Sequence, residues 1–191
     1  GSVTAGIRTV FTTLNQNLYE HNESGKRRYE AALLVAILHG SDLFLARAGS
    51  SVALLSHEET LEAFPDIFAS AQAAASPPLG LNPVLDVKLN RYRIASGTRL
   101  VLADTALAGQ NTDAIRGALG TAHIGEVLNG FKALAASQLT LLAVEFVPPD
   151  APVPLPVRVG ESTRETTAPA PPAAPGETGA PRTSALAGAV S

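Results

Sequence analysis

Apolar residues recur at helical spacing at three places along the chain. The first set is Ile7, Val10, Phe11, Leu14 and Leu18. Residues spaced three and four positions apart share one face of a helix, so this set predicts an amphipathic helix that ends in the polar stretch 21–28. The same spacing predicts a short helix over 115–119 and a longer one over 124–134.

Between these helices, short apolar runs bounded by turn residues predict β-strands. The runs cover 31–38, 43–48, 52–55, 85–94, 99–103 and 139–147. The run at 31–38 contains no polar residue, which is typical of a strand buried on both faces. Tight turns join it to the next two runs, and three strands joined in this way predict an antiparallel meander. In the fourth run the apolar phase flips near Asn90-Arg91, which indicates a β-bulge.

The order of these elements is helix, meander, hairpin, two helices and a closing strand. This order predicts an α+β fold with mainly antiparallel pairing, because strands and helices do not alternate as they do in parallel βαβ units. The segment 69–78, which is rich in small residues, is expected to form a loop between the meander and the hairpin.

Composition divides the chain near residue 147. Ten of its 14 prolines lie between Pro148 and Pro181, and all nine aromatic residues lie at or before Phe146. A Pro-, Ala- and Thr-rich segment without aromatic residues buries too little apolar surface to offset its ordering entropy. We therefore expect a globular domain over 3–147 and a disordered linker or tail over 148–191, with a docking or phosphorylation segment at Ser162–Thr167 as the alternative.

Charge and residue types exclude several classes of function. The net charge of −3 and the lack of a Lys/Arg block argue against a nucleic-acid surface. No apolar run reaches the roughly 20 residues of a membrane span. The absence of cysteine excludes thiol catalysis and zinc–thiolate sites, and is compatible with a cytoplasmic protein or the cytoplasmic part of a larger or membrane-anchored one. The chain has no methionine, and Gly1-Ser2 is typical of a cloning scar.

Four segments share the order and spacing of motifs in a known enzyme family. They are Glu30–Val52 (EAALLVAILHGSDLFLARAGSSV), Pro78-Leu79-Gly80, Ser96–Thr105 (SGTRLVLADT) and Ser137–Thr140 (SQLT). This arrangement resembles the metal-dependent serine/threonine protein phosphatases, the PPM or type 2C family. There the motifs are Gly-Thr-Thr leading to Gly-Asp-Ser-Arg, Leu-Gly, a strand ending in Ser-Asp-Gly, and Asp-Asn-x-Thr. The resemblance covers 3–147 and implies an αββα sandwich of mainly antiparallel sheets flanked by helices, here without its first strands.

The resemblance also implies a chemistry that this chain retains only in part. In the family, a carboxylate cluster holds two divalent metals, Mg²⁺ or Mn²⁺, and a metal-bridging water attacks the phosphoester. Only Asp104 stands where a family metal ligand would stand, as a vestigial ligand. Other motif positions are replaced, and the residues found there are Glu30, Ala31, Ser50, Val52 and Ser137. The early Asp-Gly hairpin is absent from this sequence, so we expect no catalytic residue and no cofactor.

Each candidate residue also has a structural interpretation. Asp104, with Thr105, can cap the turn at 106–109, and Asp113 can cap a helix or lie in its first turn. His57-Glu58-Glu59 lacks the second histidine of a zinc motif and is expected to start a solvated helix. Gly49-Ser50-Ser51 lacks the sequence context of a hydrolase serine. The remaining candidates have no partner in the sequence: His21, His39, His123 and the basic run Lys26-Arg27-Arg28.

Three functions are compatible with these observations. The first is a non-catalytic, phosphatase-like regulatory or protein-binding module in signalling, with a protein or phosphoprotein as its partner. The second is an active Mg²⁺- or Mn²⁺-dependent protein serine/threonine phosphatase whose N-terminal metal-binding strands are absent from this sequence. The third is a structural or oligomerisation domain, because missing strands would leave sheet edges open to pairing with another chain.

Overall fold

The computed structural model describes residues 2–135, 138–148 and 150–151, and its elements follow the apolar pattern of the sequence. The helices are α1 (Val3–Ser24), α2 (Thr112–Leu119) and α3 (Ile124–Leu134), with short 3₁₀ helices η1 (Ala71–Ala74) and η2 (Thr105–Leu107). The strands are β1 (Leu33–His39), β2 (Asp42–Ala48), β3 (Val52–His57), β4 (Thr60–Phe64), β5 (Lys88–Arg93), β6 (Arg99–Ala103) and β7 (Leu141–Glu145). All three predicted helices are confirmed, and each predicted run overlaps a strand.

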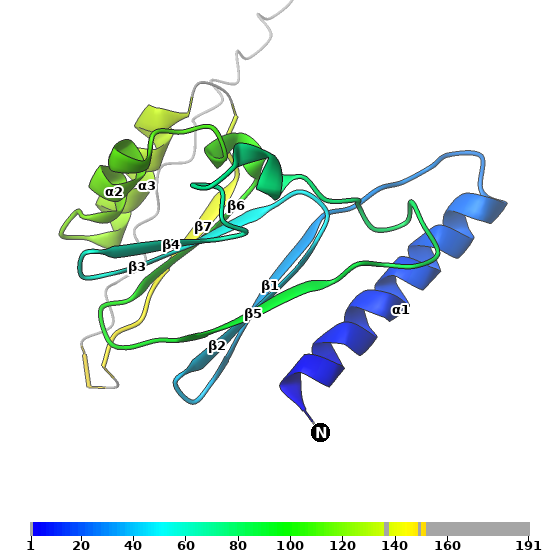
Figure 1. Ribbon diagram of the computed structural model, residues 1–191, viewed down its shortest axis with the longest axis horizontal. Coiled ribbons are helices and arrows are strands. Elements are labelled where there is room, and N and C mark those ends of the chain that lie inside the picture. Colours follow the sequence, from blue (N-terminus) through cyan, green and yellow to red (C-terminus); the bar gives the residue numbers. More distant parts are fainter. Residues whose placement is uncertain (1, 136–137, 149, 152–191) are drawn as a thin grey trace, which may run out of the picture. The chain divides into compact units, whose positions relative to one another are not determined.

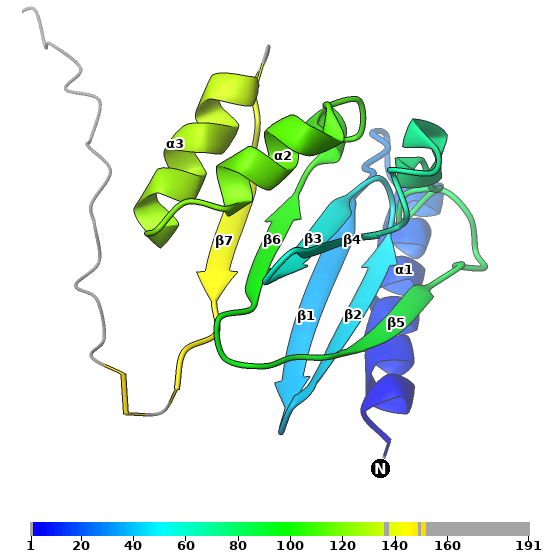
Figure 2. The ribbon, with the colours of Figure 1, turned by 60° about the vertical axis from the view of Figure 1, so that its left-hand side comes forward.

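The strands form two antiparallel sheets, in the orders β1-β2-β5 and β4-β3-β6-β7. One apolar cluster joins α1 to the outer face of the first sheet, and another joins α2 and α3 to the outer face of the second. A third cluster fills the space between the sheets. Figure 1 and Figure 2 show the resulting layers, with α1 on one side of the two sheets and α2 and α3 on the other. The predicted αββα sandwich is therefore confirmed.

The predicted meander of three strands is wrong. β1 pairs with β2, but β3 pairs with β4 and β6 in the other sheet. Gly49, with a φ of 79°, lies in the turn between β2 and β3, where the chain passes from one sheet to the other. The residues of this turn are typical of a hairpin, which is why the sequence predicts one. The sequence pattern does not show which partner each strand pairs with.

The first and fifth strands also differ from their predictions. β1 is an edge strand with residues 33–37 half-buried, whereas the uninterrupted apolar run predicts burial on both faces. The predicted bulge at Asn90-Arg91 is wrong, because β2 and β5 pair residue for residue across this region. The apolar phase changes because Leu89 packs in the α1 cluster, whereas Tyr92 packs between the sheets.

The predicted helix start at His57-Glu58-Glu59 is a hairpin turn. β3 ends at His57 and β4 begins at Thr60, and these two residues pair with each other. Glu58 takes a positive φ of 52° in the turn, a conformation that favours glycine or asparagine. The turn therefore lacks its usual sequence signal, and β4 is the one strand that the sequence analysis did not predict.

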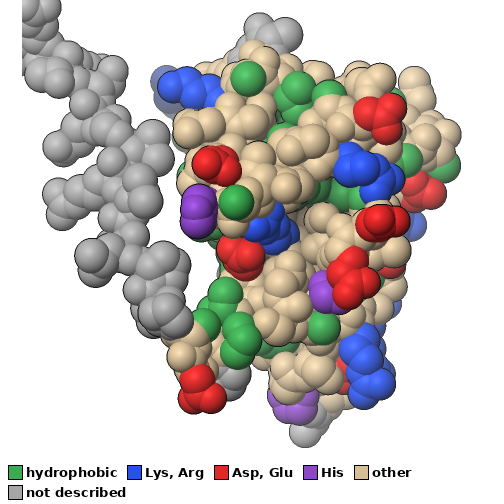
Figure 3. All heavy atoms as spheres, turned by 90° about the vertical axis from the view of Figure 1, so that its left-hand side faces the viewer, with side chains coloured by type: hydrophobic (Ala, Val, Ile, Leu, Met, Phe, Trp, Pro, Cys, Tyr) green, Lys and Arg blue, Asp and Glu red, His purple; other side chains and the backbone are tan. Residues whose placement is uncertain are grey.

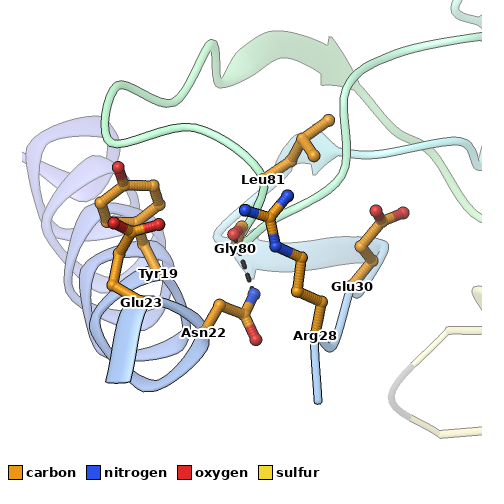
Figure 4. A pocket seen from close by; sticks show the side chains of 7 residues that line it. All are labelled: Tyr19, Asn22, Glu23, Arg28, Glu30, Gly80 and Leu81. Atoms are coloured by element: carbon orange, nitrogen blue, oxygen red, sulfur yellow. Dashed lines mark hydrogen bonds between the residues drawn. The ribbon is translucent and has the colours of Figure 1, made fainter. Parts of the chain in front are cut away.

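Two buried asparagines on α1 hold the neighbouring loops. The Asn15 amide donates to Asn82 O at 2.9 Å, and its carbonyl oxygen accepts from Gly80 N at 2.9 Å. The Asn22 amide donates to Tyr29 O and Gly80 O at 2.7 and 2.9 Å, and its oxygen accepts from Tyr29 N at 2.8 Å. Figure 4 shows the Asn22 side chain directed at Gly80. These hydrogen bonds provide partners for backbone N–H and C=O groups of the loops that pack against α1.

We expect Asn22→Ala to lower the free energy of unfolding by about 2 kcal/mol, because three backbone groups, one buried and two part-buried, lose their partner. The matched control is Asn17→Ala on the exposed side of the same helix, which should change stability by less than about 0.5 kcal/mol. Urea denaturation of both variants measures the difference. Equal changes in the two variants would show that the hydrogen bonds of Asn22 do not stabilise the fold.

The surface agrees with the absence of a basic block in the sequence. On the face shown in Figure 3, Lys and Arg side chains are interspersed with Asp and Glu, and no continuous basic patch forms among the described residues. No helix in the described part of the chain is long and apolar enough to cross a membrane.

Candidate functional site

The motif segments identified in the sequence converge at one end of the sandwich. Ala31 and Leu79 exchange two backbone hydrogen bonds, with N–O distances of 3.3 and 2.8 Å. The Gly49 backbone lies so close to Ala32 that a Cβ at Gly49 would be 2.7 Å from Ala32 Cα. In the second sheet Val52 pairs with Ala103, so Asp104 follows directly beyond that pair. The fold thus brings to one end of the sandwich motif segments that are distant in the sequence.

Asp104 lies at this end of the sandwich and acts as a structural connector. Its Oδ1 accepts from Ala106 N at 2.9 Å and caps η2, as the structural interpretation predicts. Its Oδ2 accepts from Thr140 N at 2.8 Å, and its own N donates to Thr140 O at 3.1 Å. Both carboxylate oxygens are therefore engaged with backbone N–H groups that link the end of β6 to the start of β7.

We expect Asp104→Ala to lower the free energy of unfolding by about 2 kcal/mol, since a cap and a second hydrogen bond are lost together. Asp113 provides the matched control: it is exposed in the first turn of α2, where Asn111 supplies the cap. Asp113→Ala should cost less than about 0.5 kcal/mol. Thermal unfolding of the two variants distinguishes them, and equal midpoints would contradict the connecting role of Asp104.

The described residues at this end do not fit a pair of divalent metals. Nowhere in the described ranges do three or more His, Cys, Asp or Glu side chains gather as they would to hold a metal ion. Ser50 is exposed, and its hydroxyl lies 3.4 Å from both N and O of Ser76. Ser137 lies outside the described residues. A lone, already hydrogen-bonded carboxylate does not supply the several oxygen ligands that Mg²⁺ or Mn²⁺ requires.

Arg47 is a buried cation that the sequence analysis missed. Only 2% of its surface is exposed, and burial lowers the pKa of its guanidinium. The guanidinium donates to three carbonyl oxygens, of Ser51 at 2.8 Å, Ala74 at 2.9 Å and Ala73 at 2.9 Å. It therefore fixes the loop containing η1 against β2. The signal was present in the sequence, because Arg47 is the one charged residue inside the apolar run 43–48.

The region around Arg47 also holds the buried side-chain atoms that lack a hydrogen bond among the described residues. These are Arg47 Nε and Ser51 Oγ. A pocket of about 420 Å³ adjoins Arg47 and is also lined by Ser76, Asp86 and Lys88. Lys88 Nζ and Asp86 Oδ2 are 2.6 Å apart, so these two side chains neutralise each other. This arrangement supports a structural role for Arg47 as the tether of a loop.

Two further pockets contain polar side chains but no reactive constellation. The pocket in Figure 4 has a volume of about 20 Å³, enough for about one water. A second, of about 150 Å³, includes His57, Thr98 and Tyr92. His57 Nδ1 is 3.4 Å from Thr98 Oγ1, which is long for a nucleophile and its base, and Thr98 Oγ1 already accepts from Ala95 N. Burial raises the pKa of the Tyr92 hydroxyl, so this side chain stays neutral.

The other candidate residues form no metal-binding group in the described structure. His39 ends β1 beside a tight turn, and His123 precedes α3 without capping it. His21 lies in the last turn of α1 with its ring centre 5.5 Å from that of Tyr29. The basic run 26–28 is in the loop after α1. The fold therefore gathers the motif segments but brings none of the histidines or basic residues to Asp104.

Comparison with solved structures identifies the fold. No protein-family model matches the sequence, and no curated protein matches it either. The structure resembles PppA, described as a key regulatory component of T6SS in Pseudomonas aeruginosa, with a TM-score of 0.57 and 17% identity over 75% of this chain and 70% of that one. It also resembles the serine/threonine phosphatase of S. agalactiae, with a TM-score of 0.61 and 14% identity over 78% and 74% of the two chains.

A third similar structure is the serine/threonine phosphatase Stp1 from Staphylococcus aureus, with a TM-score of 0.61 and 13% identity over 76% of this chain and 68% of that one. Identities this low speak for the fold alone. The chain has the fold of the PPM-type serine/threonine phosphatases, as the sequence motifs predict. The similarity of fold says nothing of the role of Asp104 or of activity.

Proposed function

We propose that this chain is a non-catalytic, phosphatase-like module that regulates or binds a protein partner in signalling. One observation carries the proposal: Asp104, the only acidic residue at a PPM metal position in this sequence, has both oxygens bound to backbone N–H groups. A fold that keeps its layers while its metal ligand serves as a connector is suited to recognition rather than hydrolysis.

The chemistry of phosphoester hydrolysis in this fold supports the same proposal. Two adjacent divalent metals would need several carboxylates to offset their charge and to hold a bridging water. Here Ser50 and Val52 replace the Asp and Arg of one motif, and Ser137 replaces the Asp of another. Neutral hydroxyl and aliphatic side chains cannot offset the positive charge of two divalent metals.

The similarity to PppA is compatible with a regulatory role, since that protein is described as a regulatory component of its own system. For this chain we propose a protein or phosphoprotein partner, a cytoplasmic setting, and use of 148–191 as a linker. Most of that segment lies outside the described residues.

The competing function is an active Mg²⁺- or Mn²⁺-dependent protein phosphatase completed by strands that this sequence lacks. The retention of Asp104 favours it. Hydrolysis of an aryl phosphate, measured with and without Mn²⁺ for the chain, Asp104→Asn and the exposed control Asp113→Asn, separates the two. We expect no Mn²⁺-dependent turnover in any of the three. Turnover that is lost in Asp104→Asn and kept in Asp113→Asn would overturn the proposal.

A further inference from the structure

β1 is the outermost strand of its sheet, and one of its backbone edges has no strand beside it among the described residues. The two-residue turn after β1 pairs His39 with Asp42, so odd-numbered residues of β1 direct their N–H and C=O groups toward β2. Ala31, which is also odd-numbered, uses its N–H and C=O groups to bond Leu79, in line with this alternation. Even-numbered residues from 32 to 38 therefore direct their backbone groups to the open edge.

This open edge differs in charge from the other three sheet edges of the described structure. The outer strands β4, β5 and β7 carry charged residues, which are Glu62, Lys88, Arg91, Arg93 and Glu145. Charges on edge strands hinder pairing with another chain. β1 has none: residues 31–38 are all Ala, Leu, Val or Ile, and they contain no proline. The edge thus lacks each of the usual protections.

A groove runs beside this edge between β1 and α1. Two apolar pockets of about 330 and 390 Å³ lie along it. Val35 and Ile37 of β1 line the first pocket together with Val10 of α1, and Leu33 lines the second with Leu14. Val10 and Leu14 are 55% and 45% exposed, which is high for large aliphatic side chains that line one groove. The groove accepts apolar side chains from a strand added next to β1.

We propose that β1 pairs with β1 of a second copy of this chain, in antiparallel orientation, to form a continuous six-stranded sheet. A two-fold interface uses the same patch twice, and an uncharged apolar strand meets no repulsion from its own copy. Helix-facing side chains of one β1 would fill the groove beside α1 of the other. The pocket beside the middle of β1 is lined by Val10, Val35 and Ile37 and not by Asp104, so the inference does not depend on whether Asp104 serves a catalytic metal.

In a pair of β1 strands, outward-directed residues must lie opposite each other, and all of these have even numbers. The two-fold axis must therefore pass through a residue and not between two residues. An axis at Val35 pairs the four outward residues with one another, 32 with 38 and 34 with 36. An axis at Ala36 would place Ala32 opposite Gly40, which already lies in the turn between β1 and β2. The register centred on Val35 therefore gives the longer ladder.

The first test is the mass in solution, compared between two matched lysine variants. Sedimentation equilibrium should give a species of twice the 19.6 kDa chain for the unsubstituted protein. Leu38→Lys introduces a charge at an exposed position of the edge and should weaken dimerisation on the order of 100-fold. Leu142→Lys on β7, 57% exposed, should leave dimerisation unchanged. A monomer at every soluble concentration, or equal effects of both lysines, overturns the proposal.

The second test uses the absence of cysteine from the chain. Val35 would face itself across the axis as a non-hydrogen-bonded pair, with Cα atoms about 4.5 Å apart, within the range of a disulfide. Val35→Cys should form a covalent dimer on mild oxidation, and adding Leu38→Lys should abolish it. Leu142→Cys is the control and should stay monomeric on a denaturing gel. A dimer in solution without the Val35→Cys cross-link would place the interface elsewhere and overturn the proposal.

Discussion

Replacing Arg47 with Met is expected to lower the free energy of unfolding by about 4 kcal/mol, because three carbonyl oxygens lose their donor. Two of these oxygens, of Ala73 and Ala74, lie at the end of η1, so the loop also loses its attachment to β2. Urea denaturation followed by circular dichroism measures the change. The predicted loss is the largest for any single side chain considered because charge, hydrogen bonding and loop anchoring depend on one group.

Arg47→Lys is the matched variant. It keeps the positive charge but replaces a planar group with five donors by a compact ammonium, which reaches fewer of the three carbonyls. We expect a loss of about 2 kcal/mol, between the original and the Met variant. The desolvation cost of the buried guanidinium opposes its hydrogen bonds. A Met variant as stable as the original would show that desolvation outweighs them and would contradict the tethering role.

Gly80→Ala is expected to lower the free energy of unfolding by about 3 kcal/mol. Gly80 has a φ of 83°, where an L side chain costs about 1 kcal/mol in backbone strain. A Cβ there would also lie 2.6 Å from Leu18 Cγ and 2.9 Å from Tyr29 O, and such overpacking adds about 2 kcal/mol. Thermal and urea unfolding both report the change.

Gly97 supplies a control that separates these two contributions. Its φ is 84°, almost the same as that of Gly80, but a Cβ at Gly97 would meet nothing within 4 Å. Gly97→Ala should therefore cost only the backbone strain, about 1 kcal/mol. Equal losses at the two positions would show that α1 can move away from the loop without a cost in free energy. That result would contradict the tight packing of Leu18 on Gly80.

The periodicity of the sequence predicts the helices and most strands because it depends on local burial. The spacing of Ile7, Phe11 and Leu18 identifies the face of α1 that packs on a sheet. Asn15 and Asn22 lie on that same face, seven residues apart, and both are buried. Polar residues at this spacing on an apolar helix face indicate buried hydrogen bonds. Strand pairing depends on distant segments instead, so β2 and β3 were assigned to one sheet although they lie in two.

The candidate site was predictable in its position but less so in its chemistry. The sequence motifs identify Asp104 as a candidate, and the structure places it directly after β6, next to the pair Val52 and Ala103. That its carboxylate binds Thr140 N, 36 residues away, follows only from the fold. Cap chemistry alone predicted the bond to Ala106 N, because that contact is local. The carbonyl partners of Arg47, at Ser51, Ala73 and Ala74, belong to other segments and are brought to it only by the fold.

The proposed lack of metal ligands is compatible with the observed layers in physical terms. The three apolar clusters, not the site, hold the helices and sheets together. In an active PPM site, neighbouring carboxylates would repel one another until metals neutralised them. Replacing such carboxylates with Ser50 and Ser137 removes that repulsion, so this chain should fold without metal.

A calorimetric titration of the chain with Mn²⁺ tests the central claim most directly, with thermal unfolding measured at the same metal concentrations. We predict no stoichiometric binding and no rise in the unfolding midpoint, because Asp104 is the single acidic residue at a PPM metal position in this sequence and both its oxygens are already hydrogen-bonded. Binding of two Mn²⁺ ions per chain, with a rise in the midpoint that Asp104→Asn removes, would contradict this account.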